Sequence, residues 1–174
     1  VMATRAGDVD PGLILYLLTE IGLSPSDVET LLNRESGLLG MSGVSGEMRV
    51  LMNASDPAAH LAVDVYCYRA RKYLGAYLAV LGGVDAILFG GGIGENCPEI
   101  RSRILAGMDY AGITLSPQAN ARTTGIEGRI SPDDTPVGVY VVPVDEQALL
   151  AQEAMQVVSP PAGQRARSIG VNER

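Results

Sequence analysis

Residues 85–96 have the sequence DAILFGGGIGEN, and this stretch decides the fold class. The apolar run at 85–89 is bounded by glycines on both sides, which predicts a strand that is buried on both faces. A long helix is predicted from Asp56-Pro57 to about Leu81, where a pair of glycines ends it. The glycine-rich residues 90–96 predict a turn, after which Pro98 begins another helix. This order of helix, buried strand, turn and helix predicts an α/β protein built in layers.

The remaining elements are predicted from helix caps and hydrophobic spacing. We expect one domain over 1–158 and a disordered tail over 159–174, where proline, glycine and charged residues are frequent. The apolar side of the long helix is expected to include Val63, Tyr66, Tyr73, Leu74, Tyr77 and Leu81, and its polar side Arg69, Arg71 and Lys72. The other predicted elements are helices over 11–21 and 25–36, a mobile loop over 37–46, a short helix over 47–52, a second buried strand over 137–144 and a last helix capped by Asp145.

Composition and charge exclude several classes of protein. The chain has 174 residues, of which 47% are hydrophobic and 19% charged, and this excludes a disordered chain. A formal net charge of −7 argues against nucleic acid or an anionic membrane as partner. No apolar run reaches the roughly 18 residues that a membrane-spanning helix needs. Cys67 and Cys97 are too few for a disulfide scaffold and fit a reducing compartment, so we expect a cytoplasmic protein.

The glycine turn is the sharpest candidate for a binding site. Three consecutive glycines, 90–92, let the backbone come close to a ligand and direct free N–H groups toward an anion. A dinucleotide fingerprint would need glycine at Glu95, and a P-loop would need lysine after Gly94, so neither familiar motif is present. Two interpretations stay open from the residues alone. One is contact with a nucleotide or phosphate, and the other is a tight connection between a strand and a helix.

Three further segments place charges next to a predicted helix start or strand end. Arg5 can hold a planar anion, and Asp8 and Asp10 can face magnesium through water; alternatively, Asp10 is only a helix cap and Arg5 a surface residue. Residues 45–49, SGEMR, carry a charge pair that is either functional or part of a capped surface helix. Residues 143–147, PVDEQ, follow the second strand, where open α/β sheets place ligands and a carboxylate suits a metal. Charges at helix N-termini are common for structural reasons too.

Together these segments resemble the C-terminal half of acetate kinases, which form the acetokinase family within the actin-like and sugar-kinase superfamily. Residues 2–11, MATRAGDVDP, are similar to the family's M-G-T-R-S-G-D-hydrophobic-D-P. Residues 42–49, SGVSGEMR, are similar to its S-G-[VI]-S-S-D-x-R. Residues 91–96 match its G-G-I-G-E-N, and residues 143–146, PVDE, resemble its P-T-N-E. The resemblance covers nearly all of the chain apart from the tail.

The resemblance implies a fold, a reaction and a set of site residues. The fold is an actin-like ATPase (ribonuclease H-like) domain with a mixed sheet layered with helices, the C-terminal portion of a two-domain kinase. The reaction is reversible phosphoryl transfer from ATP to acetate, giving acetyl phosphate and ADP, in a homodimer that uses Mg²⁺. Arg5 is then catalytic and stabilises charge on the phosphoryl group in flight, and Glu146 helps to hold magnesium. The nucleotide-binding residues are Glu47, Met48, Arg49, Gly91, Gly92, Ile93, Gly94, Glu95 and Asn96.

The chain also departs from the family pattern. Glu47 replaces an aspartate, and its extra methylene changes the position of the carboxylate that the resemblance places near the nucleotide. The family's N-terminal half supplies the substrate pocket, a catalytic arginine and aspartate, a transition-state histidine and another phosphate-binding loop. None of these has a counterpart here, so we expect a truncated chain that is inactive alone. The alternatives are a propionate or butyrate kinase of the same family and a non-catalytic nucleotide-binding module. The other departures are Ala3, Ala6, Gly46, Val144 and Asp145.

Overall fold

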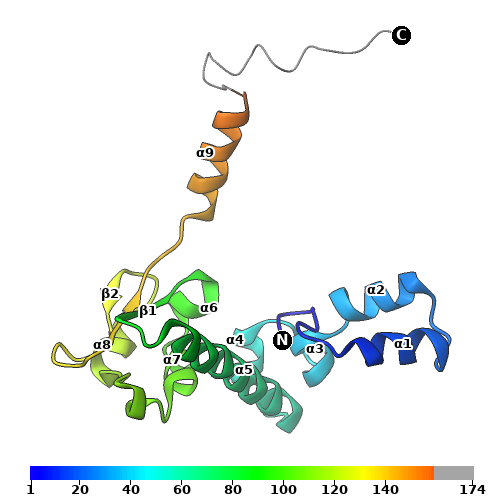
Figure 1. The fold of residues 1–174 in the computed structure, drawn as a ribbon, viewed down its shortest axis with the longest axis horizontal. Helices are drawn as coiled ribbons and strands as arrows, with labels where there is room; N and C mark the ends of the chain where they lie inside the picture. Colours follow the sequence, from blue (N-terminus) through cyan, green and yellow to red (C-terminus); the bar gives the residue numbers. More distant parts are fainter. Residues whose placement is uncertain (159–174) are drawn as a thin grey trace. The chain divides into compact units, whose positions relative to one another are not determined.

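The computed structural model describes residues 1–158, which are drawn in colour in Figure 1. It contains two compact units, Val1–Val142 and Pro143–Arg174, and the second is described as far as residue 158. None of the described helices combines the length and the apolar character that crossing a membrane requires. The tail predicted for 159–174 lies outside the described residues. The second unit contains α9 (Glu146–Val158), and the first contains α1 (Pro11–Thr19), α2 (Pro25–Arg34), α3 (Gly37–Ser42), α4 (Met48–Asn53), α5 (Pro57–Leu81), β1 (Ala86–Phe89), α6 (Gly91–Asn96), α7 (Pro98–Leu105), a 3₁₀ turn (Asp109–Ala111), α8 (Pro117–Arg122), β2 (Gly128–Arg129) and β3 (Gly138–Val141).

Capping residues explain where the main helices begin and end. The side chains of Asp10, Ser24 and Asp56 each accept a hydrogen bond from an amide in the first turn of α1, α2 and α5, and a proline follows each cap. At the far end of α5, Gly82 adopts a left-handed conformation with φ +72°, which closes the helix. The helices predicted at these positions are confirmed, and so is the short helix at 47–52, which corresponds to α4.

The mobile loop predicted over 37–46 is wrong in its first half, because α3 forms there. Leu38 of this helix is 1% exposed and packs in the hydrophobic core. The amides of Leu38 and Leu39 donate to the carbonyl groups of Met2 and Ala3. The N-terminal segment thereby satisfies N–H groups that the first turn of a helix leaves free. Since these partners are far apart in sequence, local spacing did not reveal the helix.

A three-stranded sheet in the order β1-β3-β2 belongs to the first unit. β1 pairs with β3 in parallel, with Ile87 opposite Val139, and β2 pairs with β3 in antiparallel orientation. Parallel and antiparallel pairing in one sheet, flanked by helices, confirms the predicted α/β class with a mixed sheet. The strand predicted over 137–144 is shorter than expected and ends before Pro143, which has no amide to donate to a neighbouring strand.

β1 buries one of its faces within the described residues. Ile87 is 8% exposed and joins the core, whereas Leu88 on the opposite face is 66% exposed. Because successive side chains of a strand point to opposite faces, the core lies on the side of Ile87 alone. The prediction that this strand is buried on both faces is therefore wrong for the structure.

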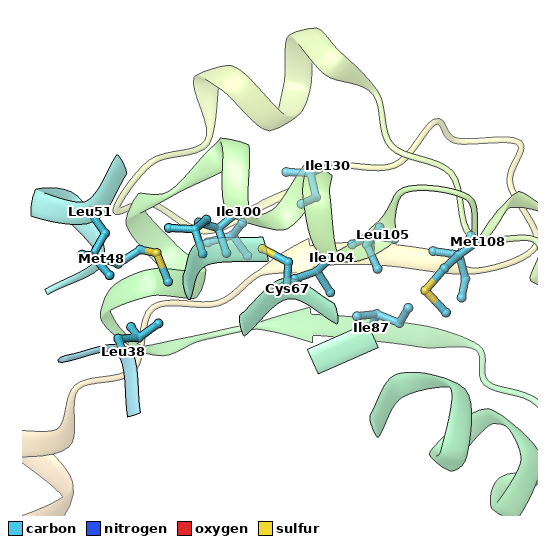
Figure 2. Packing of buried hydrophobic residues seen from close by; sticks show 14 of the residues in the cluster. Leu38, Met48, Leu51, Cys67, Ile87, Ile100, Ile104, Leu105, Met108 and Ile130 are labelled. Carbon is cyan, nitrogen blue, oxygen red and sulfur yellow. The ribbon is translucent and has the colours of Figure 1, made fainter. Parts of the chain in front are cut away.

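One hydrophobic cluster joins α3, α4, α5, α7 and the sheet, and Figure 2 shows side chains from these elements lying together. The contribution of α5 follows a narrow stripe of small side chains at helical spacing. Small residues leave room for neighbouring helices to come close at the packing density of a protein interior. The buried residues of α5 are Ala59, Ala62, Val63 and Cys67.

In the second half of α5, the predicted apolar side is confirmed at Leu74 and is wrong at Tyr73, Tyr77 and Leu81, which are exposed. There the residues packed against the core are Ala70, Leu74 and Leu78, which continue the buried stripe at spacings of four. Tyr73 and Tyr77 are exposed, because each lies one position earlier on the helix and is rotated away from the stripe by about 100°.

Arg71, predicted on the polar side of α5, reaches across to α7. Its Nε atom donates to the carbonyl oxygen of Ile104 at 2.8 Å, and Nη2 donates to the carbonyl oxygen of Arg103. Both carbonyl groups belong to the last turn of α7, where helical carbonyls have no partner within the helix. Arg71 therefore caps the C-terminus of α7 and joins it to α5.

The two faces of β1 predict opposite outcomes for neighbouring substitutions. Ile87→Ala is expected to lower the free energy of unfolding by about 2–5 kcal/mol, because it leaves a cavity in the core. Leu88→Ala is expected to change it by less than about 0.5 kcal/mol, because that side chain is exposed. Chemical denaturation of both variants measures the difference. An equal loss in the two variants would contradict burial on one face only.

Candidate functional site

The segment 2–6 runs beside the connection between α2 and α3. The amide of Ser36 donates to the carbonyl oxygen of Thr4 at 3.0 Å. The backbones come so close that a Cβ atom on Gly37, which has φ +63°, would collide with the carbonyl oxygen of Met2. This glycine is therefore required both for its conformation and for the close approach. The first candidate segment is thus held by residues that follow it at some distance in the sequence.

Arg5 is exposed and oriented by α2. Its Nε atom donates to Oδ1 of Asn33 at 3.3 Å, and Nδ2 of Asn33 donates to the carbonyl oxygen of Glu29 at 3.0 Å. The guanidinium end can meet a carboxylate or a phosphate in a bidentate manner, as its planar fork of donors allows. The structure thus leaves Arg5 available for the anionic contact predicted from the sequence.

Asp8 and Asp10 have protein partners. Nη2 of Arg69 and the hydroxyl of Tyr73 both donate to Oδ2 of Asp8. The hydrogen bond from Tyr73, together with the positive charge of Arg69, holds the pKa of Asp8 below its ordinary value, and the same bond raises the pKa of Tyr73. Asp10 accepts from the amide of Gly12 as the cap of α1. Among the described side chains, no three His, Cys, Asp or Glu residues gather as a metal site would require.

The glycine turn predicted over 90–96 is a short helix, α6, so that prediction is corrected. Gly91 has φ +71°, a conformation that favours glycine, and its amide donates to Oε1 of Glu95 at 2.8 Å. A Cβ atom on Gly94 would lie 3.3 Å from the backbone of β1, which gives that glycine a packing role. A Cβ atom on Gly92 would meet no atom within 4 Å. The connection between strand and helix therefore explains Gly91 and Gly94, but it does not explain Gly92.

Glu47, Met48 and Arg49 lie at the start of α4. The amide of Glu47 donates to Oγ of Ser45 at 3.0 Å, which helps to begin the helix. Met48 is 5% exposed and belongs to the core, whereas the side chains of Glu47 and Arg49 are exposed. Met48 from α4 and Ile93 from α6 pack in the same hydrophobic cluster. One core thus supports both segments predicted to contact a nucleotide.

Arg101 was not predicted from the sequence, although it is the largest fully buried side chain of the described residues. Its Nη1 atom donates to the carbonyl oxygens of Gly94 and Glu95 at 2.6 and 3.0 Å. Nε and Nη2 donate to the side-chain and backbone oxygens of Asn120, both at 2.8 Å, and Nη2 also donates to the carbonyl oxygen of Thr123 at 2.6 Å. Burial lowers the pKa of Arg101, and these oxygens replace its lost hydration. Because arginine is rarely buried, the position of Arg101 in a predicted helix does not indicate a buried hydrogen-bond network.

The last candidate segment begins the second unit. Oδ1 of Asp145 accepts from the amide of Ala148 at 2.9 Å, so the predicted cap of α9 is confirmed. Glu146 is the first residue of α9, and its side chain lies outside the described part of the structure. Its role in holding a metal stays a prediction.

The family model described as the Acetokinase family matches residues 1–152. This chain belongs to the acetokinase family. The acetate kinase of Solibacter usitatus is 46% identical over 162 residues, and that of Chloroherpeton thalassium is 47% identical over 163 residues. Each comparison covers 91% of this chain and 39% of the relative, so the chain spans about two fifths of the length of these curated relatives.

Solved structures of acetokinase-type enzymes share the fold. The crystal structure of Porphyromonas gingivalis acetate kinase superposes with a TM-score of 0.83 at 40% identity, over 91% of this chain and 40% of that chain. A propionate kinase from Francisella tularensis superposes with a TM-score of 0.79 at 31% identity, over 88% of this chain and 39% of that chain. The family predicted from the motifs is confirmed, and the layered mixed sheet agrees with an actin-like ATPase fold.

Two departures from the acetokinase pattern lie against each other. A Cβ atom on Gly46 would lie 2.9 Å from the carbonyl oxygen of Ala3 and 3.4 Å from its Cβ atom. The close neighbour is a backbone oxygen, so the tight fit that favours glycine at position 46 does not depend on the side chain at position 3. Packing does not account for Glu47, whose side chain is exposed.

The contact between Asp8 and α5 predicts a measurable change in pKa. Tyr73→Phe is expected to raise the pKa of Asp8 toward its ordinary value, because it removes the hydrogen bond that lowers this pKa most. Since the folded pKa lies below the unfolded one, the stabilisation from this carboxylate is present above the ordinary pKa and is lost as the pH falls through the folded pKa. NMR titration of the carboxyl carbon measures the shift. Tyr77→Phe, an exposed tyrosine of the same helix, is the control and should leave the pKa of Asp8 unchanged.

Proposed function

We propose that this chain is the C-terminal, nucleotide-binding part of an acetate kinase, an enzyme that interconverts ATP and acetate with ADP and acetyl phosphate. The observation that carries this proposal is the α6 segment, which keeps the family's G-G-I-G-E-N at 91–96 and leaves the space beside Gly92 open. Membership of the acetokinase family supports it, as do relatives named acetate kinase at 46% and 47% identity.

Each candidate residue is assigned one of the roles that phosphoryl transfer requires. Positioning and charge stabilisation supply most of the catalysis in this class of reaction. The backbone of 91–96 approaches the nucleotide, and Glu47 and Arg49 contact it from the start of α4. Arg5 stabilises the charge on the phosphoryl group during transfer, a role that its exposed guanidinium suits.

We assign Mg²⁺ to Glu146 by the resemblance. Magnesium is usually held by one or two carboxylates together with substrate phosphates, so the absence of a metal cluster among the described side chains does not argue against this assignment. When bound, the ion neutralises charge on the phosphates. We also propose a cytoplasmic homodimer that uses neither nucleic acid nor a membrane as partner, in agreement with the net charge of −7.

A second candidate function is propionate or butyrate phosphorylation. The observation that favours it is the similarity to the Francisella tularensis propionate kinase structure at 31% identity. In the family, the choice of acyl chain is made by the substrate pocket of the N-terminal half. A comparison of acetate, propionate and butyrate as substrates of the whole protein separates these activities.

Binding of ADP to the 174-residue chain tests the nucleotide site. Gly92→Ala is expected to weaken binding about tenfold or more, or roughly 1.4 kcal/mol, because a methyl group enters the space proposed for the nucleotide. The fold should be unaffected, since that methyl group meets no protein atom within 4 Å. Titration calorimetry measures the affinity, and thermal unfolding confirms the fold.

Gly75→Ala is the matched control for this test. Gly75 also lies in a helix, and a Cβ atom there likewise meets no atom within 4 Å. This variant should bind ADP as the parent chain does. Equal affinity in all three proteins would rule out contact at Gly92.

The role of Arg5 is tested in the whole kinase. Arg5→Ala is expected to lower turnover by about 10³ or more, while the affinity for ATP changes much less, because the charge that Arg5 stabilises develops during transfer. Arg34→Ala, an exposed arginine of α2, should behave as the parent enzyme does. Acetyl hydroxamate formation gives the rate, and the isolated 174-residue chain should produce none above background. Near-normal turnover in Arg5→Ala, or an active isolated chain, would contradict this division of roles.

A further inference from the structure

We propose that Arg101 is a positioning residue for nucleotide binding: its buried guanidinium holds the last turn of α6 and thereby sets the backbone geometry of 91–96. The inference rests on the proposed function, because it concerns the segment to which nucleotide contact is assigned. Arg101 itself is 0% exposed, so its influence passes through α6.

The first argument is that α6 cannot hold its own shape. It has only 6 residues, and three of them are glycines. Helices of this length are unstable alone, and each interior glycine costs about 1 kcal/mol relative to alanine. The geometry of this segment must therefore be imposed by its surroundings.

The second argument is that Arg101 reaches the segment directly. Nη1 binds the carbonyl oxygens of Gly94 and Glu95, which lie in the last turn of α6. Other donors of the same planar group bind oxygens of Asn120 and Thr123 at the end of α8. One rigid fork thus fixes the distance between the C-terminal ends of two helices. The negative ends of the helix dipoles also favour a cation at this point.

The third argument is that the far side of the network is anchored. Nδ2 of Asn120 donates to the carbonyl oxygen of Pro98 at 2.8 Å and to Oγ of Ser102 at 2.9 Å, both in α7. The amide of Gly125 donates to the carbonyl oxygen of Glu95 at 3.1 Å. Residues on α7, on α8 and just after α8 therefore hold the fork in place, and α6 receives its orientation from them.

Arg101→Lys tests the proposal in the 174-residue chain. Lysine keeps the positive charge but carries its donors on a single atom, so it cannot bind acceptors on both helices as the fork does. We expect ADP affinity to fall about tenfold or more, and we expect the Cys97 amide, which closes α6 on Ile93, to exchange hydrogen faster, while amides of α5 keep their protection. Calorimetry and hydrogen exchange measure the two effects.

Two further variants separate positioning from simple loss of stability. Asn120→Ala removes one acceptor and keeps the guanidinium, so it should shift affinity and exchange in the same direction by a smaller amount, and it serves if Arg101→Lys does not fold. Ile113→Val is the control, because it removes a methylene from the core, at a residue 1% exposed, without touching the network. It should lower thermal stability and leave ADP affinity unchanged.

The outcomes decide between the inferences. Folded Arg101→Lys and Asn120→Ala proteins that bind ADP as the parent does would overturn the positioning role and leave the proposed function intact. A control that loses as much affinity as Arg101→Lys would also overturn it. If the parent chain binds no ADP, the proposed function is contradicted, and unchanged exchange at α6 in Arg101→Lys would then refute positioning independently.

Discussion

Small side chains along one face of α5 are the constraint on which the first unit depends. Ala59 and Ala62 are fully buried there, and α3, α4 and α7 all pack against this helix. Larger side chains on that stripe would push the neighbouring helices outward, because a protein interior has little spare volume. α3 binds the segment that carries Arg5, and α4 begins at the Glu47–Arg49 segment. The geometry of the candidate site therefore depends on this packing.

Local signals predicted much of the fold. Caps such as Asp10, Ser24 and Asp56 and the closing glycine Gly82 act within a few residues, so they could be recognised in the sequence. α3 could not be recognised, because its first amides are satisfied by a segment far away in the chain. α8 is not among the predicted elements, although Ser116 and the proline after it form a cap of the same type. The two-residue strand β2 carries no comparable signal.

The candidate site, like the fold, could be predicted from the sequence only in part. Motif resemblance predicted the candidate segments around Arg5, Glu47 and 91–96, because each resemblance is carried by consecutive residues of the sequence. It could not show that the side chain of Met48 serves the core, since the same residue type suits either place. Arg101 could not be predicted from a motif, because its role depends on carbonyl oxygens that only the folded chain brings together.

Arg71 also limits how the first unit can move. Its hydrogen bonds to the last carbonyl groups of α7 tie that helix to one point on α5. Proteins close around ligands either by shear, in which packed helices slide past each other, or by bending at hinges. Sliding of α7 along α5 would break these bonds, so shear at this contact is disfavoured. Because Arg101 of α7 also binds the last turn of α6, we expect α6 to move together with α7, and hinge bending to lie in connections outside the α5–α7 body.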